Sequence, residues 1–264
     1  MFAKRNKDLI EVQFDYNEDT IKKIKTIEGR KWNPKDKVWT IPLYNIEELK
    51  TKFKDELQLS EELINYKPPK ADSKVFDKEI ANITDDRLKI FTMYILDNVP
   101  DYFYHIAASS TGKYHPKFSL GEGGLVRHTK SALMFAEELF KNDTIQSFTD
   151  EEKDIIRVSL ILHDSVKKGL DGSAFTTDTH PLDASKYINI VCDNEFVPNE
   201  VKEIFNSDIC KTIKKCIEAH MGQWNKDRQG NEILSKPETE LEKFVHLCDY
   251  LSSRKFINID FKYN

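Results

Sequence analysis

The chain of 264 residues contains 39% hydrophobic and 32% charged residues and has a formal net charge of -5, which is typical of a soluble globular protein. No apolar run approaches the roughly 20 residues of a membrane-spanning helix, and residues 1–10 lack the apolar segment of a signal peptide. Because the four cysteines form no CxxC pair and three lie in helical patterns, we expect reduced thiols in a cytoplasmic protein without a membrane partner.

The charge is distributed unevenly along the chain. Residues 1–54 contain 13 Lys and Arg against 9 Asp and Glu, a balance of +4, and the remainder contains 27 against 36, a balance of -9. A basic segment followed by an acidic one indicates two modules with different partners.

The first 62 residues predict a small α+β module with the order β-α-β-β-α. Apolar and polar residues alternate over 10–16, which is typical of a half-buried strand. A short helix capped by Asn17 and ended by Gly29 follows, then a hairpin with Trp32 and Trp39 on its two arms, then a polar helix over 46–57. Residues 63–78, which include two adjacent prolines, predict an exposed linker.

Residues 24–42 resemble the HARP-type module found beside some annealing helicases and in phage proteins. The similarity is greatest over GRKW (29–32) and KVW (37–39). It implies binding of DNA or RNA, in which the basic side chains neutralise phosphates and the tryptophans stack on bases; the residues concerned are Arg30, Lys31, Trp32, Lys37 and Trp39. The alternative interpretation is that both tryptophans are core residues, because so small a module needs large aromatic side chains to fold.

Residues 79–264 predict a helical body, so the expected fold class is mainly α with a small α+β module. We expect helices that begin at Thr84, Tyr102, Gly123, Thr149 and His180, a helix over 209–220, and a last helix after Ser235 and Glu238, which have capping-box spacing. The helix from Thr149 is expected to continue to Gly169.

Several of these helices place a histidine or an aspartate on an apolar face: His128, His163, Asp164, His180, His220 and Asp249. Each buried polar group needs its own partner, and one shared metal ion would satisfy all of them together. Asp and His ligands suit a divalent ion such as Mn, Fe, Co, Mg or Zn, and the lack of cysteine ligands argues against a structural zinc site.

Four segments within residues 84–256 resemble motifs of the HD-domain metal-dependent phosphohydrolases: GGLVRHT (123–129), LHDSVK (162–167), EAHMG (218–222) and VHLCDYL (245–251). The body is similar to the HD half of bacterial 3′–5′ exoribonucleases and to phage HD proteins, which implies an HD-domain helical bundle.

The resemblance implies that His128, His163, Asp164 and Asp249 bind the metal. His180 and His220 match positions that hold a second ion or contact the substrate phosphate, and Lys167 matches a lysine that neutralises phosphate charge. Met221 stands where many two-metal members have a second adjacent histidine, so both one and two ions remain open.

The expected function is hydrolysis of a phosphate ester in a nucleotide or nucleic acid by a metal-activated water. We expect Lys167, His115 and Arg127 to bind phosphate oxygens, and His180 or His220 to protonate the leaving group. Two alternatives remain: a nucleic-acid-binding adaptor whose HD metal is structural, and a nucleotide phosphatase of the dNTPase type.

Overall fold

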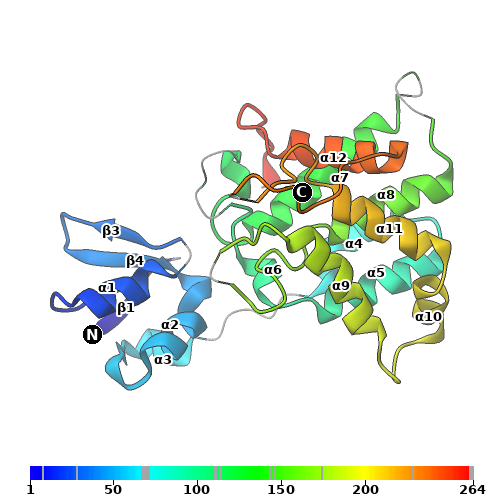
Figure 1. Ribbon diagram of the computed structural model, residues 1–264. Helices are drawn as coiled ribbons and strands as arrows, with labels where there is room; N and C mark the ends of the chain where they lie inside the picture. The colour runs from blue at the N-terminus through cyan, green and yellow to red at the C-terminus, as the bar shows by residue number, and fades with distance from the viewer. Residues whose placement is uncertain are drawn as a thin grey trace.

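The computed structural model describes residues 1–261 except 8, 28, 67–71, 110–111, 113–114, 143, 145–146, 174 and 228. It consists of a small sheet module at the N-terminus and a larger helical body (Figure 1). Each part has its own cluster of buried apolar side chains. The predicted fold class, mainly α with a small α+β module, is confirmed.

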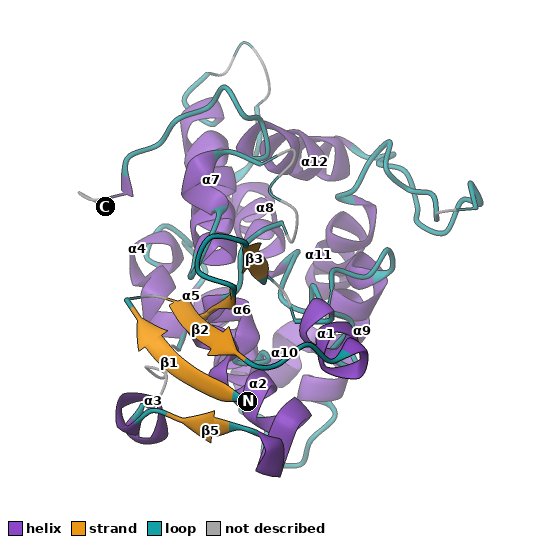
Figure 2. Ribbon diagram, turned by 90° about the vertical axis from the view of Figure 1, so that its left-hand side faces the viewer, coloured by secondary structure: helices purple, strands orange, loops and turns teal. Residues whose placement is uncertain are grey.

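The module contains a five-stranded sheet with the strand order β3-β4-β2-β1-β5 (Figure 2). All neighbouring strands are antiparallel except β1 and β5, which are parallel. The strands are β1 (Phe2–Asn6), β2 (Leu9–Gln13), β3 (Lys31–Asn33), β4 (Val38–Pro42) and β5 (Gln58–Leu59). The helices are α1 (Glu18–Lys25), α2 (Ile46–Phe53) and α3 (Glu61–Asn65).

The predicted order β-α-β-β-α was incomplete because the two missing strands, β1 and β5, carry almost no apolar pattern. Ala3 is the one fully buried residue of β1, and β5 has only two residues, so neither strand shows the alternation that marks β2. The predicted helix over 46–57 ends earlier, at Phe53, because Lys54 takes a left-handed φ of 37°.

The helical body packs around α8, which is buried on all sides over most of its length. Helices α7, α11 and α12 surround it, and α5 covers its N-terminal half. The helices are α4 (Asp77–Ile80), α5 (Asp86–Asn98), α6 (Tyr102–His105), α7 (Gly124–Leu139), α8 (Asp150–Leu162), α9 (His180–Cys192), α10 (Asn199–Phe205), α11 (Asp208–Ala219) and α12 (Glu240–Ser252). The four cysteines are buried and reduced, and none of the helices in the described ranges has the length and apolarity of a bilayer-crossing segment.

The capping box of Thr149 and Glu152 at the start of α8 is confirmed. The second one is formed by Thr239 and Glu242, so the predicted pair of Ser235 and Glu238 was wrong. Both pairs have the same spacing, and the sequence pattern does not distinguish them.

Helix α8 ends at Leu162 rather than near Gly169. The imidazole Nδ1 of His163 lies 2.7 Å from the carbonyl oxygen of Leu160, the acceptor that the amide of Asp164 would use in a continuing helix. Residues 163–170 therefore run as turns.

The module contacts the body close to these turns. The Arg30 guanidinium lies 5.5 Å from the centre of the Phe175 ring. A groove of about 410 Å³ separates α2 from the body, and on the body side it is lined by Tyr102, Lys168, Gly172 and Ser173. The module thus lies against the segment that connects Lys167 to His180.

Asp154 on α8 holds the start of α5 in place. Its Oδ2 accepts hydrogen bonds from the amide and hydroxyl of Thr84 (2.8 and 2.6 Å) and from the amide of Asp85 (3.0 Å). Its Oδ1 pairs with Arg157 at 2.9 Å. The Thr84 hydroxyl therefore bonds to Asp154 and does not cap α5. The side chain of Asp85 is the N-cap of that helix.

We predict that Asp154→Asn lowers the free energy of unfolding by about 3 kcal/mol, because it leaves the buried Arg157 charge without one of its partners. Asp150→Asn is the matched control, since the Asp150 side chain is 82% exposed and its pair with Lys153 contributes less than about 1 kcal/mol. Urea unfolding of both variants checks this, and equal midpoints would contradict it.

Candidate metal centre

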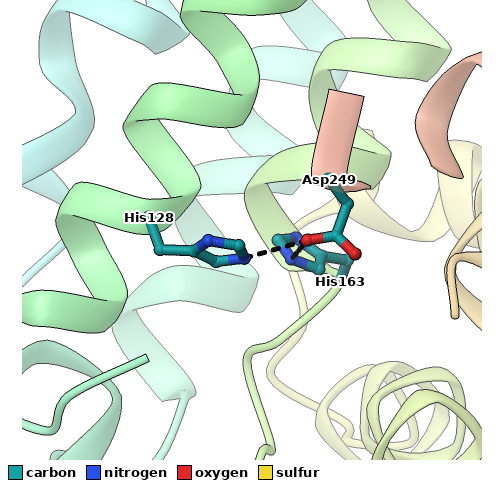
Figure 3. A group of neighbouring side chains, drawn as sticks. All are labelled: His128, His163 and Asp249. Atoms are coloured by element: carbon teal, nitrogen blue, oxygen red, sulfur yellow. Dashed lines mark ion pairs between the residues drawn. The ribbon is translucent and has the colours of Figure 1, made fainter. Parts of the chain in front are cut away.

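Three side chains from separate helices meet inside the body, as Figure 3 shows. His128 comes from α7, His163 follows α8, and Asp249 comes from α12. The Asp249 Oδ1 lies 2.9 Å from His128 Nε2 and 3.5 Å from His163 Nε2. The predicted convergence of residues far apart in the sequence is therefore present for these three.

Asp164 lies between two pairs of histidines. Its Oδ2 is 3.4 Å from His163 Nε2 and 3.7 Å from His128 Nε2. Its Oδ1 is 3.1 Å from His180 Nε2 and 3.8 Å from His220 Nε2. Asp164 Oδ2 thus faces the rings of His128 and His163, and Asp164 Oδ1 faces those of His180 and His220. This arrangement suits a carboxylate that bridges two neighbouring sets of ligands.

Three of the histidines are oriented by the backbone just before them. In each ring Nδ1 lies 2.6–2.7 Å from the carbonyl oxygen three residues earlier, namely His163 to Leu160, His180 to Thr177 and His220 to Ile217. A carbonyl oxygen only accepts, so Nδ1 carries the hydrogen. The lone pair of the neutral ring is then on Nε2, which points at Asp164.

His128 is oriented by a side chain instead. Its Nδ1 lies 3.0 Å from the Ser252 hydroxyl oxygen, and that hydroxyl donates to the Asp249 carbonyl at 2.7 Å. Because the Ser252 hydroxyl proton is already donated to that carbonyl, the hydroxyl oxygen accepts a hydrogen bond from His128 Nδ1–H. Orientation of every ring through its outer nitrogen is the pattern found around metal-binding histidines.

The donor atoms of this cluster are deeply buried, and several have no hydrogen-bond partner among the described residues. These are His163 Nε2, His180 Nε2 and Asp164 Oδ1. The short approach of His180 to Asp164 is not a hydrogen bond when the ring proton is on Nδ1. A buried polar atom without a partner costs about 1–3 kcal/mol, and a divalent cation would satisfy all three together. The residues present therefore fit a metal.

Burial lowers the pKa of His220 to about 3 and also lowers the pKa of His128. Burial acts on His163 in the same direction, but the carboxylates of Asp164 and Asp249 outweigh it and raise the pKa of His163 to about 10. At neutral pH the metal-free cluster thus contains neutral His128 and His220 beside a protonated His163.

Burial by itself would raise the pKa of both carboxylic acids. The positive charges of Lys167 and His163 overcome this at Asp164 and hold its pKa well below the usual range. The close approach of the His128 and His163 rings and the positive charge of His163 have the same effect on the pKa of Asp249. Both carboxylates are therefore ionised, as metal ligands must be.

Two further predicted site residues lie beside the cluster. Lys167 Nζ pairs with Asp164 Oδ2, and the lysine is buried. The His115 ring centre lies 5.4 Å from that of His128, and its Nδ1 is buried without a hydrogen-bond partner in the described part of the chain. Burial lowers the pKa of His115 to about 3, so its ring is neutral.

Arg127 has a different role from the predicted phosphate contact. Its guanidinium donates to the backbone carbonyls of Phe118, Leu120 and Glu122, which precede α7. These bonds fix the segment that leads from His115 to His128, and they turn the guanidinium toward backbone oxygens. The sequence does not predict these three carbonyl partners of Arg127, because they depend on how the segment before α7 folds back toward that helix.

Ser252 is the site residue that the sequence pattern did not identify. It follows Asp249 by three residues and so lies on the same helix face, which is the one signal for its role. His246, outside the cluster, binds the carbonyl oxygen of His220 through Nδ1 at 2.6 Å and faces the Gln223 side-chain oxygen through Nε2 at 3.1 Å.

The two tryptophans of the module hairpin face each other across β3 and β4, with ring centres 5.4 Å apart. Trp39 packs against the module core, whereas Trp32 is 49% exposed. Lys31 and Lys37 are exposed on the same hairpin, and Arg30 lies against Phe175. The core interpretation thus fits Trp39, while Trp32 remains accessible to a ligand.

Residues 10–62 match the family model for HepA-related protein (HARP). This confirms the predicted HARP-like character of the N-terminal module. No curated protein and no solved structure matches the chain.

We predict that the metal-free protein is most stable near pH 7, where the contribution of His163 balances those of His115, His128 and His220. Above this pH the unfolded His163 loses its proton while the folded one keeps it up to about pH 10, so stability falls as the pH rises. Below it the unfolded chain binds protons that folded His115, His128 and His220 do not bind, so stability falls as the pH falls.

Urea unfolding in EDTA between pH 5 and 8.5 measures this dependence. On the alkaline side the slope due to His163 approaches about 1.4 kcal/mol per pH unit, the effect of one differential proton. His163→Gln removes this contribution and keeps the acidic slope. Toward pH 8.5 the four cysteines, whose pKa burial raises, add the same further slope to both proteins. A urea midpoint that is constant over this range would contradict the predicted electrostatics.

Proposed function

We propose that this protein is a divalent-metal-dependent phosphohydrolase that cleaves a phosphate ester in a nucleotide or nucleic acid. The observation that carries the proposal is the convergence of four imidazole Nε2 atoms, whose rings are oriented through Nδ1 from outside the cluster, on the carboxylates of Asp164 and Asp249. A divalent cation bound there supplies a water of lowered pKa and neutralises charge on the phosphate. The resemblance of the same residues to HD-domain motifs supports this chemistry.

We assign His128, His163, Asp164 and Asp249 as the principal metal ligands. His180 and His220 face the second oxygen of Asp164 and would hold another ion or a substrate phosphate. Nitrogen and oxygen donors of this kind suit Mn, Fe, Co, Mg or Zn. The geometry accommodates one or two ions, because Asp164 presents one oxygen to each pair of rings.

Lys167 is placed to bind phosphate in this proposal. It is the cation paired with Asp164, so a phosphate oxygen approaching that carboxylate would meet its ammonium group. His115 adds a neutral ring next to His128. His220 is suited to hold a cation rather than to donate a proton, because burial lowers its pKa to about 3. This leaves His180 as our candidate for protonation of the leaving group.

Asp249 is the most exposed of the six residues. The Asp249 side chain is 15% exposed, whereas those of Asp164 and the four histidines are nearly inaccessible. A metal with a purely structural role is normally enclosed by its ligands, and a catalytic one keeps an open position. This difference favours the hydrolase over an adaptor with a structural metal.

We predict that Asp164→Asn lowers turnover of bis-p-nitrophenyl phosphate in Mn²⁺ by at least about 100-fold and also lowers the bound metal. Loss of a residue that only orients a metal ligand costs 10- to 100-fold, so loss of a ligand costs more. Asp171→Asn is the matched control, because Asp171 is an exposed carboxylate on the same segment.

Elemental analysis and initial rates check this prediction, with thermal melting as the test of folding. An Asp164→Asn protein that keeps both its metal and its turnover would refute the proposed centre. Product analysis on dNTPs, dNMPs, cyclic dinucleotides and single-stranded oligonucleotides then identifies the ester cleaved, and tripolyphosphate release from dNTPs would indicate the dNTPase-type alternative.

The proposed nucleic-acid contact of the module depends on Trp32. We predict that Trp32→Ala weakens binding of a single-stranded oligonucleotide by about 5- to 100-fold, the range expected for one lost base stack. Tyr16→Ala is the control, because Tyr16 is an exposed aromatic residue of the same module outside the hairpin. Fluorescence anisotropy at low salt measures this, and equal affinities for the two variants would retire the contact.

A further inference from the structure

An aromatic and cationic stack lies on the surface near the cluster. The rings of Trp224 and Tyr250 are stacked, with centres 5.8 Å apart and planes inclined by 16°. The Arg254 guanidinium lies 4.0 Å from the centre of the Tyr250 ring and 5.6 Å from that of Trp224. Trp224 is nevertheless 45% exposed. The large apolar ring of Trp224 is thus held in place by its neighbours although it is not buried in the core.

Helix α12 connects this stack to the metal centre. His246, Tyr250 and Arg254 are spaced by four residues and follow one face of the helix and its C-terminal end. Asp249 and Ser252 lie on the adjacent face, which points into the cluster. His246 connects the stack to the cluster, because its Nδ1 lies 2.6 Å from the His220 carbonyl oxygen and its ring centre lies 6.4 Å from that of Trp224.

Trp224 is held in place by the segment that leads from α11 to α12. The buried Asn225 donates through Nδ2 to the Leu234 carbonyl and accepts from the amides of Ile233 and Leu234. The Gly222 Cα packs against the His246 ring so closely that any Cβ there would overlap the imidazole. Among its described residues the connection 220–239 forms no helix and only one isolated bridge, and a connection of that length is uncommon unless it has a function.

Arg254 is also oriented by the backbone. Its Nε donates to the Tyr250 carbonyl at 3.1 Å and its Nη2 to the Ser253 hydroxyl at 2.7 Å. These bonds hold a positive charge over the aromatic pair. Ordered aromatic rings beside an arginine are the arrangement that proteins use to stack bases of single-stranded nucleic acid.

We propose that Trp224, Tyr250 and Arg254 form a stacking subsite for a nucleobase of the substrate. The inference rests on the proposed function, since it places the phosphate of the same molecule at the metal centre. It narrows the substrate class to esters that carry a base, and it disfavours base-free sugar phosphates and polyphosphates. Arg254 contributes its charge to a neighbouring phosphate.

The test compares ligands that differ only in the base. Calorimetry measures binding of dAMP and of deoxyribose 5-phosphate to the full chain, in Mn²⁺ and in EDTA. We expect Trp224→Ala to weaken dAMP binding about tenfold and to leave deoxyribose 5-phosphate unchanged, because one stack is lost. Trp224→Phe keeps an aromatic face and should retain most of the affinity.

Phe256→Ala is the matched control, because Phe256 is 80% exposed at the same end of the chain and is not part of the stack. It should bind dAMP as the wild type does. Initial rates on a dinucleotide and on its analogue lacking one base add a second readout, in which Trp224→Ala raises KM for the first substrate alone.

The outcomes separate the two proposals. Equal dAMP affinity in the wild type and in Trp224→Ala overturns the subsite, and metal-dependent turnover in both proteins would leave the hydrolase proposal intact. Trp224-dependent dAMP binding without turnover of any ester supports the subsite and overturns the hydrolase. Equal wild-type affinity for dAMP and deoxyribose 5-phosphate also overturns the subsite. If Trp224→Ala fails to fold, Tyr250→Leu, which removes the other ring of the stack, gives the same comparison.

Discussion

The structure depends on the burial of one carboxylate. Asp164 is almost fully enclosed, yet it is ionised and faces four imidazole nitrogens and one ammonium group. An isolated buried charge is too costly to persist, so the surrounding positive and polarisable groups are a condition for the fold as well as for any chemistry. Each of the helices α7, α8, α9, α11 and α12 contributes a group to this environment.

Helix ends do much of the positioning. The last carbonyls of a helix have no partner within it, and His163 and His220 satisfy such carbonyls at the ends of α8 and α11 through Nδ1. The same bond that completes the helix terminus fixes the direction of the other ring nitrogen. The Nδ1 hydrogen bonds of His163 and His220 thus both cap the helix ends and set the geometry of the proposed metal centre.

The N-terminal module lies beside the segment between Lys167 and His180. The residues between Lys167 and His180 contact it through Phe175 and the groove at Lys168, Gly172 and Ser173. The exposed Trp32 of the module and the exposed Trp224 of the body are both available for stacking. A nucleic acid bound by the module would therefore be close to the segment that carries two of the proposed site residues.

The sequence by itself determined the fold class, the HARP-like module, most helix starts and the set of histidines and aspartates that converge, because these follow from local periodicity, capping residues and buried polar groups on apolar faces. The tertiary structure alone decided the strands β1 and β5, the early end of α8, the role of Ser252, the backbone bonds of Arg127 and the stack of Trp224 on Tyr250. Each of these depends on a partner distant in the chain or on a carbonyl whose position the fold sets, and neither leaves a periodic signal in the sequence.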